Sequence, residues 1–179
     1  MQTISLTIWS NYFEVAATAL KSGHLYTAET MFTPALAEAE NYDLCGLQQA
    51  ASLHGLASAY LKSGRKTASE VLLRKAFRII CQTDNVNIED LRNIACLLAD
   101  SYLEEGEAAK AMPVLKVAAG QIGRRAGENT PALAPLLKRI ALIYSCCNRQ
   151  AKAEAYFARA QKIESTTQGL KVAGVQLPG

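Results

Sequence analysis

One pattern recurs along this chain with a period of 42 residues. Each copy has a leucine or isoleucine followed by alanine, then a tyrosine, a glycine or asparagine, and a final alanine. The aligned positions are Leu56, Leu98 and Ile140; Ala57, Ala99 and Ala141; Tyr60, Tyr102 and Tyr144; Gly64, Gly106 and Asn148; and Ala76, Ala118 and Ala160. A fixed period of this length predicts an array of stacked structural units, each of which packs on its neighbours.

An earlier copy precedes these three, one residue out of step. It contains Val15 and Ala16, the turn residue Gly23, and the apolar residues Phe32 and Ala35. We therefore expect four units rather than three.

Apolar residues recur at helical spacing in both halves of every copy. The spacing predicts eight helices in four helix–turn–helix repeats, at about 8–42, 49–83, 91–125 and 133–164. No stretch alternates between apolar and polar residues, so we expect no sheet. The predicted fold class is an all-α solenoid, with residues 1–164 as one helical repeat domain.

The ends of the elements follow from local signals. Residues 1–4 are predicted to be a loose start, and residues 123–129 a long basic loop. Thr130 and Pro131 are predicted to begin the seventh helix, because Thr is a good N-cap and Pro suits the first helical position. The eighth helix is predicted to end at Glu164, which leaves residues 165–179 as a flexible tail.

Composition narrows the function. The net charge of +3 on 179 residues, spread along the chain, argues against nucleic-acid binding. The five cysteines have no CxxC spacing and are not arranged with the two histidines as a zinc site, so we expect no metal and no cofactor, and most cysteines in the core. The N-terminus has no basic segment before its apolar residues, so we expect no signal peptide, no membrane-spanning segment and a cytoplasmic location.

The repeated pattern resembles the tetratricopeptide repeat over roughly residues 8–164. In the second copy the matching positions are Leu53, Leu56, Ala57, Tyr60, Gly64, Ser69, Leu73 and Ala76. The long period, Pro113 and the segment 127–144 are similar to the variety found in kinesin light chains. The resemblance implies a right-handed superhelical solenoid that binds a protein or peptide on its concave face. That variety usually carries two asparagines where this chain has His54–Gly55, Cys96–Leu97 and Lys138–Arg139.

The first helices of the repeats are expected to line that concave face. Helical spacing beside the buried stripe gives eight tentative partner-binding residues: Phe13, His54, Ser58, Lys62, Asn93, Asp100, Lys138 and Arg139. The alternative is that much of this face is ordinary solvated surface, and that His54 is a polar groove or core residue rather than a catalyst. The tyrosines share the packed face with the leucines, so we interpret them as structural rather than as a platform for bases.

No nucleophile–base pair, phosphate-binding loop or dinucleotide-binding turn is present. We therefore predict a non-catalytic interaction module or scaffold. The alternatives are a peptide-sensing regulator that acts through a partner, and a self-assembling structural protein. Apolar residues in the first and last helices, such as Trp9 and Phe157, predict self-association through a terminal repeat.

Overall fold

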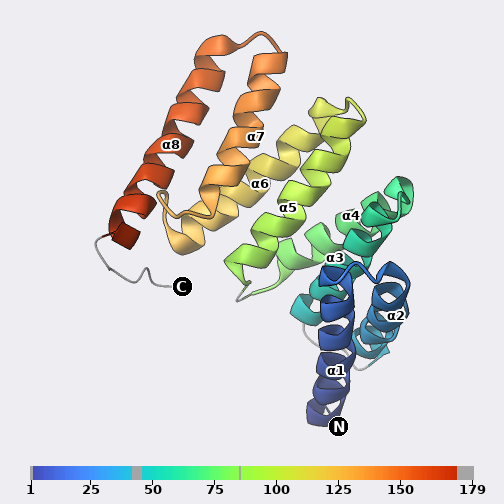
Figure 1. The fold of residues 1–179 in the computed structure, drawn as a ribbon. Helices are drawn as coiled ribbons and strands as arrows, with labels where there is room; N and C mark the ends of the chain where they lie inside the picture. Colours follow the sequence, from blue (N-terminus) through green and yellow to red (C-terminus); the bar gives the residue numbers. More distant parts are fainter. Residues whose placement is uncertain (1, 42–45, 85, 173–179) are drawn as a thin grey trace. The chain divides into compact units, whose positions relative to one another are not determined.

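The computed structural model describes residues 2–41, 46–84 and 86–172. Within these ranges every regular element is an α-helix (Figure 1). The helices are α1 (Gln2–Lys21), α2 (Leu25–Asn41), α3 (Gly46–Lys62), α4 (Lys66–Gln82), α5 (Ile88–Glu104), α6 (Ala108–Ala126), α7 (Leu133–Cys146) and α8 (Gln150–Val172). The prediction of an all-α fold with eight helices is confirmed for the described part of the chain.

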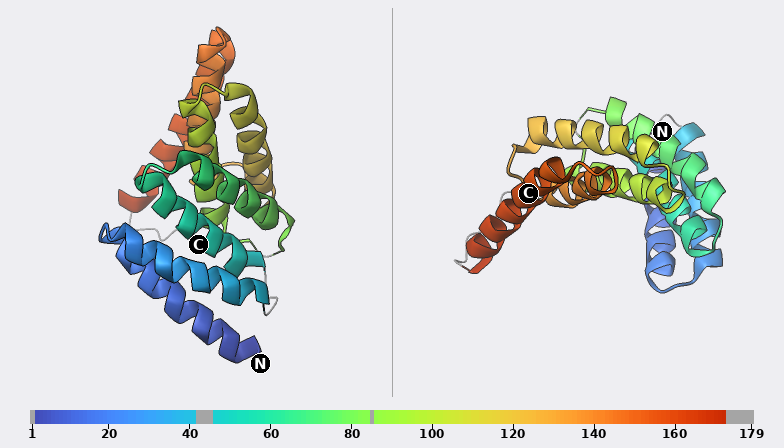
Figure 2. Two further views of the ribbon diagram at one scale, coloured as in Figure 1. Left: turned by 90° about the vertical axis from the view of Figure 1, so that its right-hand side faces the viewer. Right: turned by 90° about the horizontal axis from the view of Figure 1, so that it is seen from above.

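The chain divides into two compact units, residues 1–90 and residues 91–179. In the first unit α1 pairs with α2 and α3 with α4, and α3 also packs on α2 and contacts α1 (Figure 2). In the second unit α7 packs on both α6 and α8. Each unit therefore contains two of the predicted helix–turn–helix repeats.

The four turns within the repeats have the same hydrogen bonds. Gly23, Gly64, Gly106 and Asn148 all have positive φ angles, of 79°, 82°, 76° and 56°. In each turn the next residue donates its N–H to a carbonyl five positions back, as from Arg65 to Tyr60 at 2.8 Å. This is the Schellman arrangement, which satisfies carbonyls at a helix end and requires a left-handed residue. The repeated glycines, and asparagine in the fourth repeat, are thus explained by turn geometry.

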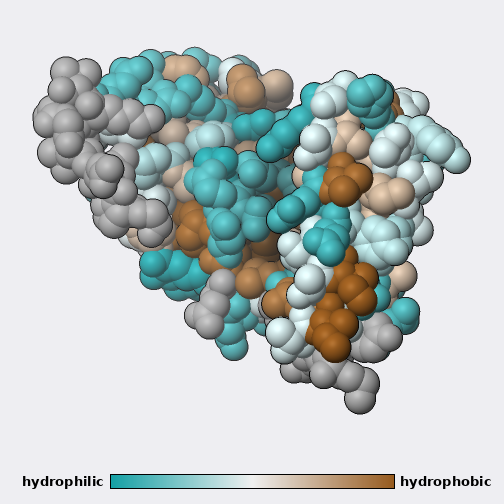
Figure 3. All heavy atoms as spheres, turned by 60° about the horizontal axis from the view of Figure 1, so that its bottom comes forward, coloured by the Kyte–Doolittle hydropathy of each residue, from teal (hydrophilic) through white to brown (hydrophobic). Residues whose placement is uncertain are grey.

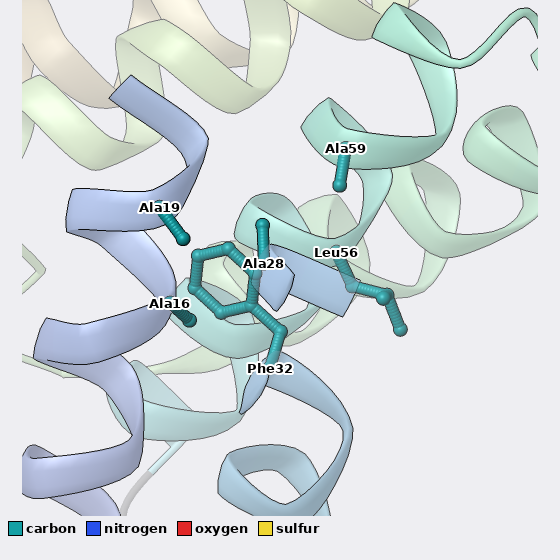
Figure 4. Packing of buried hydrophobic residues seen from close by; sticks show 6 residues of the cluster. All are labelled: Ala16, Ala19, Ala28, Phe32, Leu56 and Ala59. Atoms are coloured by element: carbon teal, nitrogen blue, oxygen red, sulfur yellow. The ribbon is translucent and has the colours of Figure 1, made fainter. Parts of the chain in front are cut away.

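Small residues let the helices of the first unit approach closely. Figure 4 shows Phe32 of α2 among alanines from α1, α2 and α3, and all of these side chains are buried. A Cβ atom added to Gly55 would lie 2.3 Å from two carbons of the Phe32 ring. The ring therefore packs directly against the α3 backbone, and only glycine fits at position 55.

The repeated positions also form the core of the second unit. Leu98 and Ile140 are each 1% exposed, and Leu115 is fully buried. At about 25 cal/mol for each Å² of apolar surface removed from water, such positions dominate the stability of a small helical unit. The residues that define the period are therefore packing residues.

Several helix ends differ from the predictions. The helix α1 begins at Gln2, so residues 2–4 are helical rather than loose. The helix α6 continues to Ala126 and includes Arg124 and Arg125 in its last turn, where cations interact favourably with the helix dipole. The helix α7 begins at Leu133, after a turn in which the Leu133 N–H donates to the Thr130 carbonyl.

The last helix extends beyond its predicted end at Glu164. Residues 165–172, predicted to be part of a flexible tail, continue α8. The hydroxyls of Ser165 and Thr166 donate to the carbonyl of Lys162, and Thr167 donates to that of Ile163. These bonds to preceding carbonyls let polar residues remain in a helix. The remaining tail, residues 173–179, lies outside the described residues.

Candidate functional site

The eight predicted binding residues lie on α1, α3, α5 and α7, the first helices of the four repeats. We call the surface that these side chains form in each unit the first-helix face, and describe it one unit at a time. In the first unit Phe13 of α1 is half-buried. Its ring stacks on Trp9 at 4.9 Å and meets the edge of Phe32 at 5.5 Å. Phe13 therefore contributes mainly to packing.

Three polar residues of α3 continue this face. His54 and Ser58 are half-buried and one turn apart, and the Ser58 hydroxyl donates to the His54 carbonyl at 2.9 Å. Burial lowers the pKa of His54 below its ordinary value of 6.5, because the charged imidazolium loses hydration. Lys62 is exposed, and its ammonium donates to the Leu20 carbonyl of α1 at 3.3 Å. The face in this unit thus offers a neutral imidazole, a hydroxyl and a cation.

A bidentate ion pair dominates the face in the second unit. Two nitrogens of Arg139 on α7 each donate to one carboxylate oxygen of Asp100 on α5, both at 2.6 Å. The Asp100 carboxylate raises the pKa of Arg139 above its ordinary value. The side chains are 40% exposed for Asp100 and 26% exposed for Arg139, so the pair links two first helices and still reaches solvent.

Asn93 and Lys138 lie on the same two helices. Asn93 is exposed, and its carbonyl oxygen accepts hydrogen bonds from the Arg92 guanidinium. The Lys138 ammonium lies 2.7 Å from a carboxylate oxygen of Glu164 on α8. Glu164 was not predicted as a site residue. It lies on α8, the second helix of its repeat, and no periodic signal in the sequence marks it.

The repeated tyrosines are used for packing and for contacts with cations. Tyr102 is 5% exposed. The Arg65 guanidinium lies 3.8 Å from the ring centre of Tyr60, and Tyr144 stacks on Tyr156 at 5.5 Å. The faces of Tyr60 and Tyr144 are therefore already occupied within the protein, which supports the structural interpretation over a platform for bases.

A furrow between α7 and α8 was not predicted from the sequence. It consists of two hollows of about 400 Å³ and 580 Å³ that share Gln161, and we call it the end furrow. The first hollow is lined by Leu142 and Phe157, and the second by Pro135 and Thr167. The signal that could have revealed it is position in the chain, because no fifth repeat follows α8 in this sequence.

The described residues contain no group of three or more His, Cys, Asp or Glu side chains that could hold a metal ion. Among the helices of the same residues, none is long and apolar enough to cross a membrane. Cys96 is buried and Cys81 is half-buried, but Cys146 and Cys147 are exposed and free, so the prediction of core cysteines is wrong for that pair. Cys45 lies outside the described residues.

Fold and sequence together define an all-α protein made of helix–turn–helix repeats. Residues 50–80, which include most of the second repeat, match the family model described as tetratricopeptide repeat. No curated protein matches the chain. The recognition made from the repeated residues is therefore confirmed in the second repeat.

Solved structures of the same fold cover most of the chain. A crystal structure of a single-residue variant of putative kinesin light chain nearly identical TPR-like repeats from Podosopora anserina has a TM-score of 0.68 at 19% identity, over 89% of this chain and 76% of that one. A crystal structure of MamA has a TM-score of 0.65 at 19% identity, over 90% and 81%. BtubC (BKLC) from P. vanneervenii has a TM-score of 0.56 at 17% identity, over 92% and 80%. At these identities the likeness shows the fold alone.

Proposed function

We propose that the protein is a non-catalytic interaction module that binds a peptide, or a segment of a partner protein, on its first-helix face. One observation carries the proposal. On α5 the repeated residues Leu98 and Ala99 are buried, whereas the non-repeating residues Asn93 and Asp100 reach solvent. The features that differ between repeats are thus the ones available to a ligand. Tetratricopeptide arrays generally act as scaffolds for protein–protein interaction, and solenoids bind along the surface formed by their stacked repeats.

The chemistry of the face suits an extended or helical peptide. In the second unit Asp100 and Arg139 hold each other in fixed positions, and Lys138 and Asn93 lie on the same two helices. Such a surface offers donors and acceptors to polar groups of a peptide without a large loss of side-chain entropy on binding. In the first unit His54, with its lowered pKa, adds a neutral imidazole.

The proposal includes two finer assignments. We assign the repeats to the kinesin-light-chain-like variety and the interaction to the cytoplasm. The period in the sequence supports the first assignment. The free cysteines among the described residues support the second, because a reducing compartment keeps thiols unpaired.

Quantitative capture from an extract of the source organism tests the function. Lys62→Glu and Lys138→Glu alter the first-helix face of one unit each, and both side chains reach solvent. Arg78→Glu and Lys162→Glu make the same charge change on exposed positions of α4 and α8 and serve as matched controls. We expect at least one first-helix variant to lose its captured protein by about tenfold or more, because a buried polar contact is typically worth that much.

Both controls should capture the same protein as the unmodified chain. Circular dichroism confirms that each variant is folded. If first-helix variants and controls capture the same proteins in equal amounts, the first-helix face is not the binding site.

A further inference from the structure

The last repeat exposes a residue that is buried elsewhere. Phe157 on α8 aligns in the repeat pattern with Phe32 and Leu115. Phe32 is 1% exposed and Leu115 is fully buried, whereas Phe157 is 43% exposed. It lines the end furrow together with Leu142, which is 58% exposed. Phe157 therefore occupies a repeat position that is buried in other repeats, but it is exposed to solvent on α8.

The first repeat shows the complementary exposure on α1. Tyr12 and Val15 align with Leu53 and Leu56, which are 1% and 6% exposed. Tyr12 is 38% exposed and Val15 is 52% exposed. Ile4 and Ile8 extend them into one stripe at helical spacing. Figure 3 shows apolar side chains gathered where Figure 1 places α1.

Contacts inside the units show what normally covers such positions. The Phe32 ring of the first repeat lies against the backbone of α3 at Gly55, which belongs to the second repeat. Asp100 of the third repeat is bound by Arg139 of α7, which belongs to the fourth. Leu56 of α3 belongs to the same buried cluster as Ala28 and Phe32, so in the first unit the first helix of the second repeat covers α2. The end furrow thus lacks a first helix, and α1 is a first helix whose corresponding face is uncovered.

We propose that the protein associates head to tail, with the exposed stripe of α1 in one copy docked in the end furrow of a second copy. The interface repeats the packing that joins successive repeats, with Val15 and Phe157 near its centre. The stripe of α1 and the part of the furrow at Leu142 and Phe157 are largely apolar, so their burial removes from water the patches that a polar terminal cap would otherwise have to cover. The contact is heterologous, because two different surfaces meet, and it leaves one free surface of each kind on every dimer. The inference concerns the ends of the array and does not depend on the function proposed for the first-helix face.

Sedimentation velocity over a range of concentrations tests the association with the full chain. The unmodified protein should form species larger than a monomer. Val15→Lys and Phe157→Glu should each weaken self-association by about 10- to 100-fold, as expected for a charge placed at the centre of an apolar interface. Val117→Lys is the matched control, since Val117 on α6 is 47% exposed and lies outside both surfaces; it should associate as the unmodified protein does.

Mixing the two blocked variants separates this mode from symmetric ones. The Val15→Lys chain retains an intact end furrow, and the Phe157→Glu chain retains an intact α1. A head-to-tail contact therefore predicts that the mixture forms a one-to-one dimer that grows no further, although each variant alone stays monomeric. Failure of the mixture to form that dimer, while the unmodified protein self-associates, would overturn the proposal.

Two other results would also overturn it. One is an unmodified chain that remains monomeric at about 100 µM, a concentration at which even weak interfaces are occupied. The other is a Leu177→Asp chain that self-associates when the unmodified chain does not. That result would mean that the chain's own segment 173–179 competes with the second copy for the furrow. A photo-crosslinker at position 142 supports the proposal if it labels residues of α1 in an isotope-labelled second copy.

Discussion

The substitution Gly55→Ala should destabilise the first unit, although alanine is the better helix former. The new Cβ would lie 2.3 Å from Cε1 and Cζ of Phe32, so the ring must move by about 1.1 Å to reach the 3.4 Å of ordinary contact. The ring cannot shift that far in place, because it is 1% exposed and also packs edge-on against Phe13. We expect it to leave its site.

The magnitude follows from two opposing effects. Losing the burial of a core phenylalanine costs about 3–5 kcal/mol, judged from truncations to alanine. Replacing glycine by alanine inside a helix returns about 1 kcal/mol. The net loss for Gly55→Ala is therefore about 2–4 kcal/mol. Gly120→Ala in α6 is the matched control, because nothing lies within 4 Å of its added Cβ, and it should stabilise its helix by about 1 kcal/mol.

Urea denaturation followed by tryptophan fluorescence measures the effect. Trp9 is the only tryptophan in the chain and belongs to the first unit, so its signal reports on that unit. The pair Phe32 and Gly55 joins the first and second repeats. The equivalent positions that join the third and fourth repeats are Leu115 and Arg139, so the smaller leucine occurs where the facing residue is not glycine. Phe32→Leu should accordingly rescue part of the loss in the Gly55→Ala background. A loss below about 1 kcal/mol would refute the argument from the ring contact.

Three further predictions concern single interactions. Trp9→Phe removes the 2.9 Å hydrogen bond to the buried Ser52 hydroxyl, and should cost about 1 kcal/mol in urea denaturation followed by circular dichroism; an unchanged midpoint would show that the bond adds nothing. Asp100→Asn breaks the bidentate pair with Arg139, and should cost about 0.5–1 kcal/mol at low salt and less in 1 M NaCl; a loss that salt does not reduce would contradict an electrostatic origin. His54 has a pKa below 6.5 in the folded protein, so the unfolded chain takes up the proton first as the pH falls. The stability that neutral His54 contributes is therefore complete above pH 6.5 and declines as the pH falls below that value. His54→Gln should flatten the pH dependence of the urea midpoint between about pH 7.5 and pH 5. An unaltered slope would exclude His54 as the cause.

The fold was predictable because similar residues recur at equivalent packing and turn positions of the repeats. Leu56 and Ala57 are buried, as are their counterparts in the third and fourth repeats, and Gly64 recurs because a left-handed turn follows each first helix. The helix α4, Lys66–Gln82, lies within the second repeat predicted at 49–83. Periodicity makes such predictions strong, since each copy tests the interpretation of the others.

Helix ends were harder to predict because they depend on single local bonds. Thr130 and Pro131 form a good helix start in isolation, yet they make a turn that precedes α7. Residues 165–167 are poor helix formers, but their hydroxyls bond to preceding carbonyls of α8. Propensity describes a residue in an average context, and tertiary and side-chain contacts override it.

The sequence identified candidate site residues but not the contacts between them. Helical spacing put Asp100 and Arg139 on the same kind of face, and the structure places them in one ion pair. No periodic signal connects Trp9 with Ser52, because this bond occurs in one repeat alone among the described ones. Interactions that do not recur need coordinates to be found.

The pairing of helices has a consequence for how the chain folds. Every pairing named above joins helices that are neighbours in sequence, or next neighbours as with α1 and α3. Loop closure between such elements costs little entropy, and low contact order is associated with fast folding. Each turn can also form as soon as its own residues have left the ribosome, because its hydrogen bonds join residues no more than five positions apart. The Schellman turns at Gly23, Gly64, Gly106 and Asn148 are therefore natural starting points for folding during synthesis.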